Sequence, residues 1–175
     1  MKNGFTTGSC AQAAAKGAFL MLTRGKIVQS AAIETPSGVK LRLPLVDQKI
    51  GGRSAACAVI KRSGEEPDVT HGAKICACVK WLKQRDVRIQ GGLGIGKVTK
   101  PGLAMPVGEW AINPVPRRMI LKEISKLLPD NRGVEVTLSV PGGKQIAKRT
   151  YNPKLGIIGG ISIIGTTGIV KPKAL

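Results

Sequence analysis

The fold is decided first by a run near the N-terminus, residues 6–22, which reads TTGSCAQAAAKGAFLML. Ser9 followed by Gln12 fits a capping box, in which two side chains satisfy backbone groups at the start of a helix. Small and apolar residues then recur at the spacing of one helix face: Ala11, Ala14, Ala15, Ala18, Phe19 and Leu22. The pattern predicts a helix over residues 10–22, with residues 6–9 as the loop that leads into it.

Strand patterns follow this helix. Within residues 26–46, apolar residues at positions 39, 41, 43 and 45 alternate with the charged Lys40 and Arg42, and residues 36–38 supply a Pro-Ser-Gly turn. Further strands are predicted over residues 55–61, 73–81, 86–90 and 134–140, although residues 73–82 also fit a helix.

A second helix is predicted over residues 116–128, because Pro116 suits a first turn and five apolar side chains that follow it share one face. After a turn at residues 141–143, we expect residues 145–150 to return as a hairpin partner, and residues 155–164 to form a buried strand. Two helices and about seven strands in irregular order favour an α+β fold over a doubly wound sheet. We expect a single domain over residues 1–175, with a mixed or antiparallel sheet packed against the two helices.

Composition excludes several classes of protein. With 42% hydrophobic and 22% charged residues, the 175-residue chain fits a globular protein with a full core. The longest uncharged stretch, residues 155–170, is short and interrupted by five glycines, so no membrane span is expected. The N-terminal apolar segment contains Lys16 and lacks a cleavage site, and the four cysteines do not form a disulfide pattern. We expect a cytoplasmic protein.

The net charge of +18 implies an acidic partner or ligand. A nucleic-acid-binding module is one interpretation. However, the basic residues are spread along the chain in pairs, and only 3% of residues are aromatic, which leaves few stacking platforms for single strands. A small polyanionic ligand explains the charge equally well.

Two loops are candidates for ligand binding. Residues 6–9, at a helix start, would leave backbone N–H groups free for an anion, although an ordinary helix cap fits as well. Residues 90–96, QGGLGIG, look like a nucleotide loop and resemble the first motif of many S-adenosylmethionine-dependent methyltransferases. Gln90 stands where that motif has an acid, and no helix is predicted after the run, so a structural turn is the favoured interpretation.

Other polar clusters suggest acid–base chemistry. Asp68 lies close to His71, the one histidine of the chain, and Glu109 lies near Asn113 and Arg117 at the second helix start. Surface charge and helix capping are the alternatives. The spacing of His71, Cys76 and Cys78 is not a usual zinc pattern, so we predict no protein-bound metal.

Seven segments taken in order resemble the CbiD family: residues 4–11, 67–70, 91–96, 98–103, 108–109, 111–114 and 159–170. The resemblance covers essentially the whole chain. It implies methylation of carbon 1 of cobalt-precorrin-5B, to give cobalt-precorrin-6A, in anaerobic cobalamin biosynthesis. It further implies S-adenosylmethionine as the methyl donor and a polycarboxylate cobalt-tetrapyrrole as the substrate, which brings its own cobalt.

Three departures from the family accompany this resemblance. Basic Lys61 and Arg62 precede a segment that is often acidic in the family, and Trp110 stands where proline is expected. Family members are also about twice as long. We therefore expect the family's C-terminal α/β half to be missing, so an inactive fragment without full donor binding is a further alternative. An oligomer is compatible with the sequence.

The candidate site residues follow from these segments. The candidate catalytic residues are His71, Asp68 and Glu109. The candidate substrate- or donor-binding residues are Thr6, Thr7, Gly8, Ser9, Gly92, Gly94, Gly96, Lys100, Asn113, Arg117, Thr166, Thr167 and Gly168. We expect residues 6–9, 91–96 and 166–168 to share one cleft, and Lys61, Lys100 and Arg117 to bind substrate carboxylates.

Overall fold

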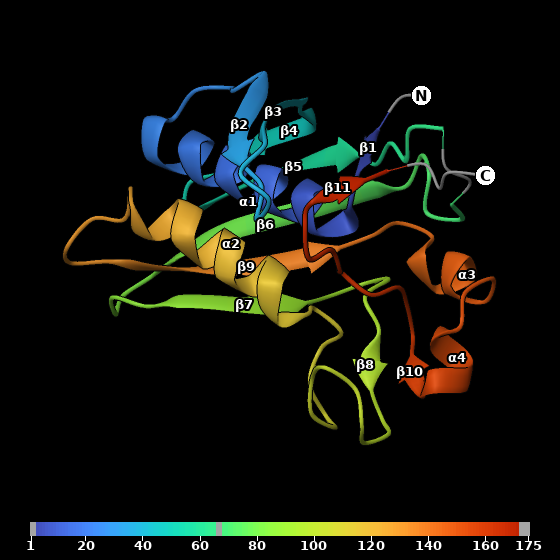
Figure 1. The fold of residues 1–175 in the computed structure, drawn as a ribbon. Helices are drawn as coiled ribbons and strands as arrows, with labels where there is room; N and C mark the ends of the chain where they lie inside the picture. The colour runs from blue at the N-terminus through green and yellow to red at the C-terminus, as the bar shows by residue number, and fades with distance from the viewer. Residues whose placement is uncertain (1–2, 66–67, 172–175) are drawn as a thin grey trace.

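The computed structural model describes residues 3–65 and 68–171. Its centre is a five-stranded sheet with the strand order β4 (Val46–Ile50), β5 (Ser54–Ile60), β6 (Lys74–Leu82), β9 (Gly133–Ser139) and β7 (Val87–Gly91). Only the pairing of β7 with β9 is parallel among these strands. The mixed sheet and the two long helices, α1 (Thr7–Arg24) and α2 (Pro114–Ser125), confirm the predicted α+β class (Figure 1).

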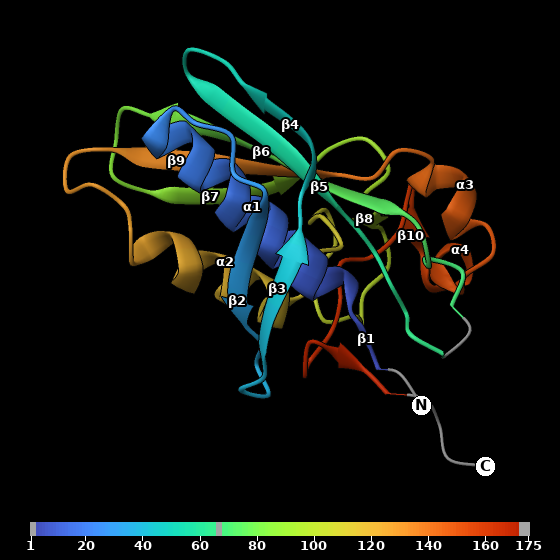
Figure 2. The same ribbon diagram turned by 90° about the horizontal axis from the view of Figure 1, so that it is seen from above.

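One face of the sheet forms the core. Alternate residues of β6 and β9 are fully buried, namely Ile75, Ala77, Val79, Val134, Val136 and Leu138. The hairpin of β2 (Ser30–Glu34) and β3 (Lys40–Pro44) crosses the other side of α1 (Figure 2), so this helix lies between two β layers. That position requires small residues on most of its surface. A Cβ added to Gly17 would lie 2.4 Å from Leu45 Cδ1.

A buried polar cluster joins α1 to α2. Gln12 Nε2 donates to Glu123 Oε1 at 3.1 Å and to the carbonyl of Glu34 at 2.9 Å, and Lys16 Nζ lies 3.4 Å from Glu123 Oε2. The predicted capping box is therefore wrong, because Gln12 bonds across the helix interface. The helix also starts earlier than predicted. Thr6 is its N-cap and accepts from the Ser9 N–H through its hydroxyl at 3.1 Å.

Several strands were predicted correctly and several segments were not. The 73–81 segment is a strand, and the 36–38 turn closes the β2–β3 hairpin. Residues 145–150 do not return as a strand, because α3 (Gly143–Ala147) forms there, followed by α4 (Asn152–Leu155). The predicted long strand at 155–164 reduces to β10 (Ile157–Ile158), paired with β8 (Lys97–Val98). The left-handed backbone at Gly156 and Gly159, with φ of 81° and 94°, interrupts any longer strand.

The two ends of the described chain meet at the start of α1. β1 (Gly4–Phe5) pairs with β11 (Ile169–Val170). The Thr7 hydroxyl accepts from the Ile164 N–H at 2.9 Å and lies 3.3 Å from the carbonyl oxygens of Ser162 and Ile164. The Gly8 N–H donates to the Ile164 carbonyl at 2.8 Å, and the Ser9 hydroxyl donates to the Gly168 carbonyl at 2.8 Å. We call these bonds between residues 6–9 and 162–168 the helix-start clamp.

Removing the Thr7 hydroxyl is expected to destabilise the fold. Thr7→Val keeps the shape of the side chain but leaves the partly buried Ile164 N–H without its acceptor, which should lower the free energy of unfolding by about 1–2 kcal/mol. The matched control is Thr23→Val, since the Thr23 hydroxyl is in the same helix but exposed, and its removal should change stability by less than about 0.5 kcal/mol. Urea unfolding of both variants measures the change in the free energy of unfolding. Equal changes for Thr7→Val and Thr23→Val would contradict a stabilising role for the helix-start clamp.

Candidate functional site

A pocket of about 410 Å³ opens beside the helix-start clamp. We call the lining residues 6–7, 161–162 and 164–165 its floor, residues 61 and 68–70 one wall, and residues 150–152 and 155 the other wall. Most of the lining is apolar or carries hydroxyl groups. The full lining is Thr6, Thr7, Lys61, Asp68, Val69, Thr70, Thr150, Tyr151, Asn152, Leu155, Ile161, Ser162, Ile164, Gly165 and Val170.

The two charged residues of this lining, Lys61 and Asp68, form an ion pair. Lys61 directly follows β5, and its side chain is only 2% exposed. Its Nζ donates to Asp68 Oδ2 at 2.9 Å and to the Ser63 hydroxyl at 2.8 Å. The other carboxylate oxygen, Asp68 Oδ1, accepts from the Thr70 N–H at 2.8 Å and from the Thr70 hydroxyl at 2.7 Å. The pair as a whole is neutral, and it fixes the loop that forms the wall.

The hydrogen bonds of Asp68 lower the pKa of its carboxyl group. Partial burial by itself raises this pKa, but the Thr70 N–H, the Thr70 hydroxyl and the Lys61 ammonium together outweigh that effect. Asp68 is therefore ionised at neutral pH and serves here as an acceptor. This geometry does not favour the predicted binding of a substrate carboxylate by Lys61, because its ammonium is buried and already bonded to Asp68 and Ser63, and that role stays a prediction.

Asn152 fixes the opposite side of the pocket. It begins α4 and is 9% exposed, and its Nδ2 lies 3.1 Å from the Gly160 carbonyl and 3.2 Å from the Ser162 hydroxyl. Tyr151, next to it, is 76% exposed at the mouth. The pocket thus combines an apolar interior, a neutral ion pair, several hydroxyls and an aromatic ring at the edge. Such a lining suits a small ligand with an apolar body and a few polar groups.

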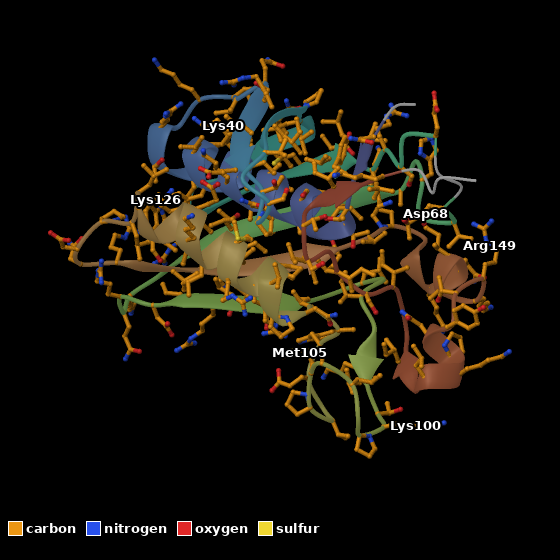
Figure 3. All side chains as sticks on the ribbon, in the orientation of Figure 1. Lys40, Asp68, Lys100, Met105, Lys126 and Arg149 are labelled. Atoms are coloured by element: carbon orange, nitrogen blue, oxygen red, sulfur yellow. The ribbon has the colours of Figure 1, made fainter. Side chains whose placement is uncertain are left out.

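Three basic residues are next in the chain to residues that line the pocket. Arg62 follows Lys61 in the chain, and Arg149 and Lys154 flank the 150–152 wall. All three are exposed, and none forms an ion pair with the residues that the structure describes. Figure 3 shows Arg149 at the same end of the molecule as Asp68, whereas Lys100 lies at the tip of the β8 region.

The two Thr-Thr-Gly segments come together as predicted. Ser9 bonds to Gly168 in the helix-start clamp, and Gly165 packs directly on the Thr6 side chain. However, the N–H groups of Gly8 and Ser9 are already bonded, to the Ile164 carbonyl and to the Thr6 hydroxyl. The expectation of free N–H groups for an anion at this helix start is therefore wrong. Thr6 and Thr7 line the pocket, whereas Thr166 and Thr167 are exposed outside its lining.

The glycine-rich run lies behind the pocket and does not line it. Two backbone hydrogen bonds join this run to Ile161. The Ile161 N–H donates to the Gly94 carbonyl, and the Gly96 N–H donates to the Ile161 carbonyl, both at 2.9 Å. A Cβ added to Gly94 would lie 2.0 Å from the Val140 carbonyl oxygen, and one added to Gly96 would lie 2.4 Å from Ile157 Cγ2. Close packing therefore explains why Gly94 and Gly96 have no side chain. Gly92 likewise lies against the Thr137 side chain.

The remaining candidates lie outside the pocket lining. His71 Nδ1 accepts from the Ser63 N–H at 3.0 Å, and His71 faces a neighbouring hollow that Lys74 and Arg149 also line. Lys100 is exposed, with its alkyl chain over Gly156. Asn113 is the N-cap of α2 but makes no side-chain cap bond. Pro67, part of the 67–70 segment, is outside the described residues.

Arg117 is engaged by the protein itself. Its Nε donates to the Ile112 carbonyl at 2.6 Å and an Nη donates to the Trp110 carbonyl at 3.2 Å, while Glu109 lies 3.9 Å away. Burial lowers the pKa of Arg117, partly offset by the Glu109 carboxylate. This geometry does not favour a role for Arg117 in binding ligand carboxylates, and that role stays a prediction.

The lining residues that were not candidates from the sequence include the polar residues Thr70, Thr150, Tyr151, Asn152 and Ser162. A strand pattern was assigned to part of this region. The Asn152-Pro153 pair is typical of a turn or a helix start, and it is the signal that could have indicated α4.

Comparison with known proteins gives a consistent result. The sequence model of CbiD matches residues 1–172. A cobalt-precorrin-5B C(1)-methyltransferase of Geobacillus kaustophilus is 50% identical over 98% of this chain and 47% of its own length. One of Thermosipho africanus is 52% identical, over 98% and 48%. The crystal structure of the cobalamin biosynthesis protein CbiD from Archaeoglobus fulgidus superposes with a TM-score of 0.74 at 33% identity, covering 99% of this chain and 56% of that one.

The chain belongs to the CbiD family.

This CbiD-family chain spans about half the length of the curated relatives that it matches. Within residues 3–65 and 68–171 it has no group of three or more His, Cys, Asp or Glu side chains placed to hold a metal ion. In the same residues, no helix has the length and apolar character needed to cross a bilayer.

The Asp68 ion pair predicts a pH dependence for this CbiD-family chain. Because the folded-state pKa of Asp68 lies below its usual value of about 3.9, ionised Asp68 contributes stability above that pH. The contribution is lost as the pH falls through the lower, folded-state value. The difference in free energy of unfolding between the wild type and Asp68→Asn should therefore be constant from about pH 7 to pH 5 and shrink below about pH 4.

Urea unfolding at each pH measures this difference. Asp86→Asn is the matched control, because the Asp86–Arg88 pair is exposed on both sides. We expect the control difference to be small at every pH. A difference for Asp68→Asn that does not change between pH 7 and pH 3 would contradict the assignment.

Proposed function

We propose that this chain provides the substrate-binding part of a methyltransferase that methylates carbon 1 of cobalt-precorrin-5B, yielding cobalt-precorrin-6A. The observation that carries the proposal is the identity of about 50% over 98% of this chain to proteins named for that activity. S-adenosylmethionine is the proposed methyl donor. The cobalt belongs to the tetrapyrrole substrate. A cytoplasmic location and an oligomeric state stay predictions.

The chemistry of this reaction places modest demands on the protein. An electron pair of the ring carbon forms the new bond to the methyl carbon, while the carbon–sulfur bond of the sulfonium breaks and its electrons stay on sulfur. The positive charge passed to the macrocycle is neutralised when the macrocycle loses one proton. Because the sulfonium is already activated, the main task of the protein is to hold donor and acceptor in line.

The pocket and its surroundings supply groups for that task. The apolar lining around Ile161 and Ile164 excludes water from the reacting atoms, and the Asp68–Lys61 pair holds one wall in place. The exposed cations Arg62, Arg149 and Lys154, which are next in the chain to lining residues, are the proposed partners of acetate and propionate side chains of a tetrapyrrole. His71, in the adjacent hollow, is the proposed proton acceptor.

The basic charge has a second interpretation, a nucleic-acid-binding module, which the family relationship does not favour. The methyltransferase and the nucleic-acid-binding interpretations differ in the salt dependence of ligand binding, since affinity for a phosphate backbone falls steeply with ionic strength. The exposed cations next in the chain to lining residues, Arg62, Arg149 and Lys154, support a compact ligand with several carboxylates.

Transfer of a labelled methyl group tests the proposal. The chain is incubated with S-adenosylmethionine carrying a tritiated methyl group and with cobalt-precorrin-5B, either alone or together with the C-terminal half of the Geobacillus kaustophilus relative as a separate polypeptide. We expect label in the tetrapyrrole fraction in at least one of these mixtures. The full-length relative is the positive control. Absence of label in both mixtures, with an active control, would overturn the proposal.

A further inference from the structure

We infer that the pocket beside the helix-start clamp binds the methyl donor, and that the tetrapyrrole lies across its mouth on the flanking cations. The inference rests on the proposed function and assigns one substrate to each part of that site. It depends on three properties of the pocket: its size, its charge and the position of its aromatic side chain.

Size favours the smaller substrate. At about 410 Å³, the volume lies near the lower end of the range for pockets that enclose a small molecule. A nucleoside joined to an amino acid, as in S-adenosylmethionine, matches that class of ligand. A macrocycle of four pyrrole-derived rings with acidic side chains on its whole edge is too large to be enclosed there, and only one edge of it fits at the mouth.

The charge of the pocket lining also favours the methyl donor. Lys61 is the one cation of the lining, and its ammonium already bonds to Asp68 and Ser63. A carboxylate-rich ligand inside the pocket would have no unpaired cation, and burying such charges without partners is costly. The donor instead carries a sulfonium cation and a zwitterionic amino acid. Asp68 accepts three hydrogen bonds and has one acceptor position left on Oδ2 for a cationic group or a hydroxyl of the donor.

An exposed aromatic ring lies at the edge of the same pocket. Tyr151 is 76% exposed, although only five residues in the chain are aromatic, and the other four are at least partly buried. A planar ring exposed beside an apolar pocket suits stacking with a base such as adenine. The Thr6 and Thr70 hydroxyls line the interior near it and can bond to a ribose.

The cations lie outside the pocket, where the second substrate would need them. Arg149 is at the same end of the molecule as Asp68 (Figure 3) and lines the neighbouring hollow, while Arg62 and Lys154 are next in the chain to the lining residues Lys61 and Leu155. A tetrapyrrole held by these side chains presents its ring edge to the mouth. A donor inside the pocket then presents its methyl group outward, toward that edge.

Binding measurements on residues 1–175 test the assignment. S-adenosylhomocysteine and cobyrinic acid, a corrinoid with many carboxyl groups, are titrated separately by calorimetry. The decisive variant is Ile164→Trp, which fills the pocket from its lining, and the matched control is Ile158→Trp, since Ile158 is similarly exposed but does not line it. Circular dichroism and thermal unfolding verify that each variant is folded.

We expect Ile164→Trp to weaken S-adenosylhomocysteine binding by about tenfold or more, with Ile158→Trp unchanged. Arg149→Glu should weaken cobyrinic acid binding and leave S-adenosylhomocysteine binding unchanged. If Ile164→Trp abolishes cobyrinic acid binding but not that of S-adenosylhomocysteine, the inference is overturned and the proposed function stands. Corrinoid binding with no binding of S-adenosylhomocysteine to the wild type also overturns it. If the wild type binds neither ligand, the inference and the proposed function both fail.

Discussion

The hydrogen bonds between the first turn of α1 and residues 162–168 are the constraint on which the rest of the structure depends. A single hydroxyl, that of Thr7, accepts the Ile164 N–H and contacts two carbonyl oxygens more than 150 positions away in the chain. Because a partly buried polar group that loses its partner costs free energy, these bonds stabilise the contact between the two segments. Five residues of these two segments, Thr6, Thr7, Ser162, Ile164 and Gly165, also line the pocket. The clamp therefore completes the fold and the candidate site in one step.

Periodicity predicted the parts of the fold that bury one continuous face. The helix over residues 10–22, the hairpin around residues 36–38 and the strand over residues 134–140 all carry repeats of apolar side chains. Periodicity failed at residues 145–164, where the chain changes direction every few residues. There the backbone conformation at Gly156 and Gly159 and the bonds of Asn152 to Gly160 determine the path. Such contacts are set by tertiary structure and leave no repeat in the sequence.

The candidate site was predictable only in part, for a related reason. Clusters of polar residues and glycines predicted candidate sites in the 68–71 segment and in the two Thr-Thr-Gly segments. Asp68 and Thr6, from two of these segments, do line the pocket. What each group does depends on its partner. Lys61 is basic in the sequence, but in the fold it is buried and neutralised by Asp68. The chain thus has a net charge of +18, although its pocket has no unpaired cation among the lining residues, and this contrast separates the two proposed substrates.

The most direct test of the account is a crystal structure of this chain with S-adenosylhomocysteine bound. The account predicts ligand density inside the pocket between Asp68 and Ile164, with the sulfur facing the mouth and the adenine against Tyr151. Density at the Gly91–Gly96 run, with the pocket free of ligand, would contradict it.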